Sequence, residues 1–237
     1  AAILSYLEKT QIGSRPLLNP PHRQLNGQTM LIDPATRASL ELTRTLSGDK
    51  KGALLAALTM TVTPAGSRLL AEQLASPSLA IDQINQRLDA IDWFVCEPAL
   101  RAQCRDALKK VPDIARCLAR LTLGRGNPRD MAAIGAGLIG AQNLCTLLSR
   151  QNNNTKSCDL IKKIIHALAQ APQTLILLLQ AALNDDLPLS RREGGFIRKG
   201  YDAALDETRT LRDESRQVVA DLQVRYADLT GIRTLKI

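Results

Sequence analysis

The sequence predicts an all-α fold, and three observations support this. Aromatic residues make up only 3% of the 237 residues and apolar residues 45%, so Leu, Ala and Ile must build the core. Strands are enriched in aromatic and β-branched residues, and this composition therefore favours helices. Apolar residues also recur at helical spacing. Finally, a capping residue followed by proline marks a helix start three times, at Asp33–Pro34, Thr63–Pro64 and Asn127–Pro128. We expect many short helices packed at varied angles, one long helix leaving the body, and at most one or two very short strands.

The elements expected in the first half of the chain are short. Residues 1–9 are typical of the end of a helix, 11–28 form a loop rich in Pro and Gly, and 29–32 fit one short strand. Helices are expected from Pro34 to near Ser47, over 51–60, after Thr63, and over 80–95, 98–109 and 112–123. The buried face of the helix after Thr63 is expected to hold Leu69, Leu70 and Leu74, and that of the next helix Ile81, Ile84, Leu88, Ile91 and Trp93.

The second half of the chain ends in the longest element. A helix opens at Asn127–Pro128 and runs to about Arg150, and two further helices are divided by Pro172. After an irregular connection over 184–195, no Gly or Pro interrupts residues 201–229. A helix of that length measures roughly 43 Å. Residues 232–237 then alternate in a strand-like pattern. One face of the helix over 201–229 carries a stripe of apolar or small residues, and opposite charges three or four residues apart line its other faces. The stripe comprises Tyr201, Leu205, Thr208, Leu211, Ser215, Val219, Leu222, Tyr226 and Leu229.

Charge and hydropathy limit the possible partners. The formal net charge of +8 is compatible with nucleic-acid binding, but the excess is spread thinly. The chain contains no run of Lys and Arg and no interleaved aromatic residues for base stacking. The longest hydrophobic patch, 174–183, is too short to cross a bilayer, and no signal peptide opens the chain. We expect no membrane association, and the missing initiator Met predicts a piece of a longer protein.

Residue types that carry chemistry are sparse. The five cysteines are widely spaced, and no pair has metal-ligand spacing. They are expected to be reduced thiols in a cytosolic protein. The two histidines, His22 and His166, have no nearby ligand partners in the sequence. We therefore predict no metal site and no catalytic residue.

A glycine motif has two interpretations. Gly135, Gly137 and Gly140 match the dinucleotide-binding pattern G-x-G-x-x-G. That pattern requires a preceding strand and a tight turn before a helix. Here a helix has already begun at Pro128, so we favour the alternative that the glycines permit close helix packing. No P-loop sequence G-x-x-x-x-G-K-[ST] occurs in the chain.

Two arginines, Arg125 and Arg129, flank the expected helix start at Pro128. Free N–H groups and the helix dipole suit an anion there, so one reading is a phosphate or carboxylate contact. The other, which we favour, is a tight turn between helices in which the arginines donate to carbonyls of neighbouring helices.

Five segments of the sequence carry motifs that occur in the same order in one known family: 30–42 with 46–48, 61–70, 121–130, 194–202 and 230–237. Together they resemble the MutS family of DNA mismatch-repair proteins. The one departure noted is Ala65, where that family usually has Met, and the Asn-rich stretch 151–155 falls where the family varies in length.

The resemblance implies a place in a larger machine. The family's proteins are dimeric sliding clamps that bind double-stranded DNA with mismatches, contact downstream mismatch-repair proteins, and work in the bacterial cytoplasm, associated with the nucleoid when on DNA. ATP and Mg are implied cofactors of the longer protein, and none is expected within this chain. By this resemblance residues 1–28 are the end of a connector helix and a linker, 29–195 are the first part of the helical core, and 196–237 are the outgoing lever helix and first clamp strand.

The functional expectation is mechanical. By resemblance, the segment links an ATPase to a DNA clamp and is not itself an enzyme. The candidates for DNA phosphate contacts at the far end of the lever are Arg225, Arg233 and Lys236. We slightly favour the alternative that they are solvated lever residues and that the DNA contacts lie beyond residue 237. The alternatives are a helical protein–protein interaction module, similar to an α-solenoid, with no direct DNA role, and an enzyme that uses the glycine motif.

Overall fold

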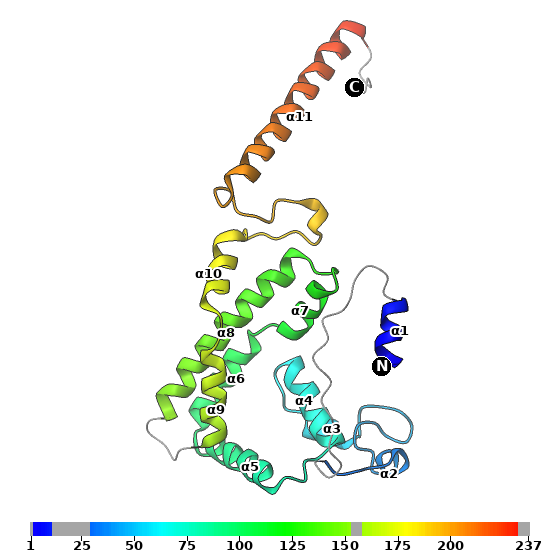
Figure 1. Cartoon of the computed structure of the whole chain (residues 1–237), viewed down its shortest axis with the longest axis vertical. Helices are drawn as coiled ribbons and strands as arrows, with labels where there is room; N and C mark the ends of the chain where they lie inside the picture. The colour runs from blue at the N-terminus through cyan, green and yellow to red at the C-terminus, as the bar shows by residue number, and fades with distance from the viewer. Residues whose placement is uncertain (1, 11–28, 153–157, 232–237) are drawn as a thin grey trace. The chain divides into compact units, whose positions relative to one another are not determined.

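The computed structural model describes residues 2–10, 29–152 and 158–231, and within these ranges the chain is helical (Figure 1). The described residues form no sheet. Two isolated antiparallel bridges, Thr29 with Ser78 and Leu183 with Ile197, are their only extended pairings. The predicted all-α fold is therefore confirmed. The expected loop at 11–28 and strand at 232–237 lie outside the described residues.

The described helices follow the predicted order. Their bounds are α1 Ala2–Thr10, α2 Pro34–Ser39, α3 Leu54–Leu58, α4 Pro64–Ala75, α5 Ile81–Cys96, α6 Pro98–Lys109, α7 Ile114–Thr122, α8 Pro128–Asn152, α9 Asp159–Ala169, α10 Gln173–Ala182, the 3-10 turn η1 Arg191–Glu193, and α11 Ala203–Thr230.

All three proline-marked helix starts are present. The side chain of Asp33 accepts a hydrogen bond from the Thr36 amide, and that of Thr63 accepts one from the Gly66 amide. Asn127 caps α8 in the same way, because its side-chain oxygen accepts from the Asp130 amide at 3.0 Å. Each cap satisfies one of the free N–H groups that a helix start leaves behind.

The first of these helices is shorter than expected. It was predicted to continue to near Ser47, but α2 ends at Ser39. Glu41 adopts a positive φ of 47°, which ends helical geometry. Its carboxylate accepts a hydrogen bond from the Leu46 amide at 2.6 Å, and its carbonyl accepts one from the Leu54 amide at 3.0 Å. These contacts turn the chain back toward α3.

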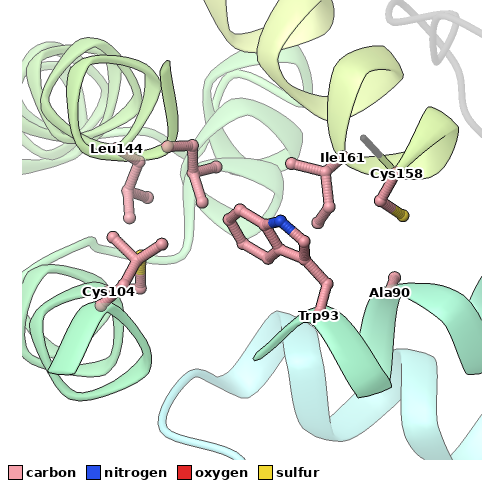
Figure 2. Close-up of a cluster of buried hydrophobic side chains, with 8 residues drawn as sticks. Ala90, Trp93, Cys104, Leu144, Cys158 and Ile161 are labelled. Atoms are coloured by element: carbon pink, nitrogen blue, oxygen red, sulfur yellow. The ribbon is translucent and has the colours of Figure 1, made fainter. Parts of the chain in front are cut away.

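The chain divides into two compact units, residues 1–180 and 181–237. The core of the first is a hydrophobic cluster contributed by α5, α6, α8, α9 and Cys158. Trp93 lies in the middle of this cluster, with Cys104 and Leu144 on one side and Ile161 and Cys158 on the other (Figure 2). Its ring also packs edge-on against Phe94, with centroids 4.9 Å apart.

The predicted buried face of α5 is wrong in part. Trp93 is buried, as expected, but Ile81, Leu88 and Ile91 are 71%, 55% and 59% exposed. The helix instead turns Ala90 and Trp93 toward α6 and α9, its neighbours in the cluster. The same holds on α4, where Leu69 is 54% exposed. Periodicity identified residues that share a face, but the buried face is the one that meets another helix.

Helix α8 also differs from expectation. By length and composition alone, Pro128–Arg150 could cross a membrane, and α9 with α10 passes the same test only if the two are taken together across a 46° bend. Yet α8 packs against α6, α7 and α9 and carries a buried aspartate, Asp130, in its first turn. Such packing is that of the central helix of a bundle.

The second unit begins with an ordered connection. The Asn184 amide donates to the Phe196 carbonyl at 2.9 Å, and the Arg198 amide donates to the Ala182 carbonyl at 2.7 Å. The Arg198 guanidinium also donates to the Leu183 carbonyl. The connection over 184–195 is irregular, as expected, apart from the 3-10 turn η1, and these hydrogen bonds join the residues at its two ends.

The predicted long helix is confirmed as α11, which runs without interruption from Ala203 to Thr230 (Figure 1). Asp202 caps it, and Gly231, at a φ of 68°, ends it in the left-handed conformation. Arg209 fixes its first turns by donating to the Ile197 carbonyl at 2.9 Å. Every side chain from 210 to 222 is exposed. The domain limits expected at 28 and 195 stay predictions.

Candidate functional site

The turn between α7 and α8 is closed from both sides. At the end of α7, the Arg125 amide donates to the Arg120 carbonyl at 2.9 Å and the Gly124 amide donates to the Leu121 carbonyl at 3.0 Å. This pair of bonds is a Schellman motif, in which one residue must adopt the left-handed conformation. Gly124 does so, with a φ of 68°.

At the start of α8, Asn127 and Asp130 bond reciprocally. The Asn127 side chain accepts from the Asp130 amide, and the Asp130 carboxylate accepts from the Asn127 amide, each at 3.0 Å. This is the arrangement of a capping box, with Asn and Asp in the two roles. We call this turn the α7–α8 corner. Backbone groups at the end of α7 and at the start of α8 thus find hydrogen-bond partners within the corner itself.

Asp130 also pairs with Arg120 of α7. The Arg120 Nε donates to Asp130 Oδ1 at 2.9 Å, and its Nη2 reaches the same oxygen. The Asp130 residue is 4% exposed. The hydrogen bond from Arg120 holds the pKa of Asp130 below its ordinary value, because it favours the charged form. Burial raises the pKa of the neighbouring Cys117 thiol, to which Arg120 also donates.

The two arginines predicted at this turn occupy different positions. Arg125 and Arg129 are both exposed, Arg125 just after the Schellman glycine and Arg129 in the first turn of α8. The anion that the start of α8 binds in this structure is the chain's own Asp130, and the partner cation is Arg120. Contacts of Arg125 or Arg129 with an external anion, or with carbonyls of neighbouring helices, stay predictions.

The α8 glycines permit close packing, as predicted. A Cβ placed on Gly137 would lie 2.5 Å from Cδ1 of Ile114, and one on Gly140 would lie 2.7 Å from Cγ2 of Val111. Real Cβ atoms do not approach so closely. All three glycines lie inside α8, not in a turn that follows a strand. The dinucleotide interpretation therefore lacks the structure that it requires.

The residues expected to contact DNA lie at the end of α11 and beyond. Arg225 is exposed in the last turns of the helix, whereas Arg233 and Lys236 lie outside the described residues. The helix as a whole carries four arginines against six carboxylates, so its length is slightly acidic. Contacts of Arg225, Arg233 and Lys236 with DNA phosphates stay predictions.

One face of α11 carries a regular seam. We define this seam as eight residues that alternate in steps of three and four: Leu205, Thr208, Arg212, Ser215, Val219, Leu222, Tyr226 and Leu229. Such spacing is typical of a helix that packs lengthwise against another. Val219, Leu222 and Tyr226 are 44%, 37% and 48% exposed. The described residues contain no cluster of His, Cys, Asp or Glu able to hold a metal ion.

Comparison with known proteins assigns the chain to a protein family. The family model described as MutS domain III matches residues 35–230. The chain is 54% identical over all 237 residues to a DNA mismatch repair protein MutS of Rhodopseudomonas palustris (strain HaA2), covering 26% of that protein. Over the same length it is 51% identical to the protein of that name from Bradyrhizobium sp. (strain ORS 278), covering 26% of it, and 49% identical to that from Azorhizobium caulinodans, covering 25%.

The chain thus spans about a quarter of the length of these curated relatives. Its match to the family model extends from the start of α2 to the end of α11. Most of the motifs that suggested the resemblance lie within helices and turns that the structure describes, including the α7–α8 corner. The chain belongs to the MutS domain III family.

Proposed function

We propose that the chain is the non-catalytic core and lever segment of a DNA mismatch repair protein, in which it links an ATPase to a DNA clamp. The observation that carries this proposal is α11. At about 1.5 Å per residue, its 28 residues span roughly 42 Å. Charge pairs such as Arg209 with Asp206, at 3.1 Å, support a stiff rod. Rotating its base by about 5° moves the far end by roughly 4 Å.

The seam on α11 is the surface through which the rod would be held. Its apolar members from Val219 to Leu229 are exposed, and exposed apolar stripes at this spacing typically cover a partner helix. By family resemblance, that partner is a second lever helix that returns from the clamp in the longer protein. Two helices packed along the seam would resist bending better than one.

The longer protein would supply the chemistry. ATP and Mg would bind in its ATPase domain, and the clamp would enclose mismatched double-stranded DNA within a homodimer that downstream mismatch-repair proteins recognise in the bacterial cytoplasm. In this chain, Arg225, Arg233 and Lys236 would contact DNA phosphates without reading sequence. Membership of the MutS domain III family favours this role over a stand-alone helical interaction module.

The seam can be tested in the full-length protein that contains this segment. Leu222→Asp places a charge in the seam, whereas Val224→Asp places the same charge on the opposite face of the same turn, where Val224 is 62% exposed. We expect Leu222→Asp to slow ATP-triggered release of mismatched DNA by about tenfold, a loss of roughly 1.4 kcal/mol in coupling, with ATP hydrolysis in the absence of DNA unchanged. Val224→Asp should behave as the unmodified protein. Equal effects of the two variants would refute the lever role of the seam.

The contacts at the end of the helix need a separate test. Replacing Arg225, Arg233 and Lys236 together by Ala should weaken DNA binding of the full-length protein and flatten its dependence on salt, because each phosphate contact adds about 0.9 to the slope of log K against log salt. An unchanged slope would remove these residues from the DNA interface but leave the lever proposal standing.

A further inference from the structure

Residues 29–79 form a small body of their own, which we call the lobe; it holds α2, α3 and α4. Its two ends meet where the Met30 amide donates to the Pro77 carbonyl at 2.8 Å. Inside it, the Leu55 amide donates to the Leu42 carbonyl at 2.9 Å, and Leu42 and Ala53 are buried. The lobe therefore has internal ties that do not depend on the rest of the chain.

The hydrophobic cluster of the neighbouring bundle, α5 to α9, contains no residue of the lobe. Its buried members run from Ala90 to Ile161. Several apolar side chains of the lobe are instead turned to solvent: Leu58 is 50% exposed, Met60 74% and Leu69 54%. Shared apolar burial, which resists separation most strongly, is thus small between the two bodies.

Two arginines join the lobe to the bundle, one from each side. Arg68 of α4 donates through Nη1 and Nη2 to the two carboxylate oxygens of Asp113, at 2.8 and 2.9 Å. In the other direction, Arg105 of α6 donates to the Met60 carbonyl at 2.8 Å. The fork on Asp113 is a bidentate pair, which fixes orientation as well as distance. The Arg68 side chain is nevertheless 43% exposed, so water and salt reach it.

Asp113 belongs to a firmly held part of the bundle. It is the N-cap of α7, where it accepts from the Arg116 amide, and the Arg116 Nε lies 3.6 Å from its carboxylate. The next residue, Ile114, packs into the notch that Gly137 leaves in α8. The lobe is therefore bound to the N-cap residue of a helix that is itself tightly packed.

We propose that the ion pair between Arg68 and Asp113 is a latch on which the lobe opens and closes against the bundle as one body. A contact made of exposed charged groups exchanges protein partners for water at small cost, whereas the ties inside the lobe and the core of the bundle stay intact. This goes beyond the lever role, because it places a joint inside the core segment itself, and it does not depend on that role.

The movement can be measured as a distance in the 237-residue chain. Cys96 of α5 is exposed and accepts one spin label, and Glu72→Cys, at an exposed position of α4, accepts the other. The remaining cysteines are buried or half-buried. Two variants are compared in this background: Arg68→Met, which removes the latch, and Arg116→Met, which removes a charge beside the same carboxylate but on the same helix.

We expect Arg68→Met to add a second, longer distance, with the ratio of open to closed forms raised roughly three- to fivefold, as the loss of an exposed ion pair predicts. Arg116→Met should keep the distribution of the unmodified chain. Raising salt from about 50 to 500 mM should open the unmodified lobe and leave Arg68→Met unchanged. Circular dichroism should show the same helix content throughout.

Two results would overturn the latch. The first is a distance distribution that Arg68→Met leaves unchanged, and the second is equal opening in Arg116→Met. If Arg68→Met loses helix content, the salt series on the unmodified chain decides: opening at the higher salt concentration supports the latch, and an unchanged distribution rejects it.

Discussion

Replacing Gly137 by Ala tests whether the glycines of α8 exist for packing. Two opposing effects act on this variant. Alanine is the better helix former, by about 0.8–1.0 kcal/mol in a helix interior. Against that, the new Cβ would lie 2.5 Å from Cδ1 of Ile114, so the side chain or the helix must shift. Overpacking of this kind costs about 1–3 kcal/mol. The expected net change is a loss of up to about 2 kcal/mol.

The matched control lies two residues earlier on the same helix. A Cβ on Gly135 would lie 3.4 Å from Cδ1 of Leu179, close to ordinary contact. Gly135→Ala therefore gains most of the helix propensity with little overpacking. Because the propensity gain is common to both variants, the difference between them isolates the packing effect, and Gly137→Ala should be the less stable by about 1–3 kcal/mol.

Urea unfolding followed by circular dichroism measures this difference, with about 2–4 °C in Tm per kcal/mol as a thermal check. Repeating Gly137→Ala in an Ile114→Ala background completes the test. That background removes the atoms that would clash, so the substitution should then stabilise the chain. The packing explanation is refuted if Gly137→Ala is as stable as Gly135→Ala, or if its penalty persists without the Ile114 side chain.

Three further predictions concern the corner and the core. The pKa of Asp130 is lowered in the folded chain, chiefly by Arg120, so the contribution of this carboxylate to stability is present above the ordinary pKa of 3.8 and is lost as the pH falls below it. Asp130→Asn should therefore make the loss of stability with falling pH less steep. An acid titration of stability that the substitution leaves unaltered would contradict this. Gly124→Ala forces alanine into a φ of 68°, and its new Cβ would have no neighbouring atom within 4 Å. The free energy of unfolding should therefore fall by about 1 kcal/mol through backbone strain alone. A variant as stable as the unmodified chain would argue against the Schellman turn. Trp93 Nε1 is buried with no hydrogen-bond partner among the described residues. Trp93→Phe should therefore change the free energy of unfolding by under about 1 kcal/mol, compared with about 3–5 kcal/mol for Trp93→Ala. Similar losses in both variants, measured by urea unfolding, would show that burying the indole N–H without a partner costs no stability.

Local signals in the sequence predicted the helix starts well. Asp33, Thr63 and Asn127 each accept the capping hydrogen bond that their position beside proline suggested. Caps depend on neighbours only a few residues away, so a single sequence contains nearly all the information needed. Proline and glycine positions likewise bounded α11, because its N-cap and its terminal glycine are both local features.

Burial was harder to predict, because it depends on residues far away in the sequence. The apolar stripe on α5 is real, yet Leu88 and Ile91 remain exposed while Ala90 and Trp93 face the core. The spacing of apolar residues shows which of them share a face, but not which helix that face meets. Where a chain is about a quarter of its relatives' length, a face can also belong to an interface formed with the remaining three quarters.

The sequence located the turn between α7 and α8, but it did not identify the residues that pair there. Arg125 and Arg129 were predicted to act at this turn because they flank a helix start. Arg120 has no sequence signal that distinguishes it from other charged residues on solvated helix faces. The signal that could have found the pair is the Asn-x-x-Asp spacing of residues 127–130, a capping box whose carboxylate has a free oxygen for one more donor. Its partner had to come from the preceding helix, ten residues away.

That separation of ten residues has a kinetic consequence. The entropy lost in closing a loop grows with the logarithm of its length, so the corner between Arg120 and Asp130 closes about 1.3 kcal/mol more cheaply than the contact between Arg68 and Asp113, which spans 45 residues. The corner should therefore form early, and substitution of Asp130 should slow refolding. The contact of Arg68 should form late, so that Arg68→Met leaves the refolding rate unchanged and accelerates unfolding. The order in which this domain assembles is thus set at a turn of a few residues between two helices.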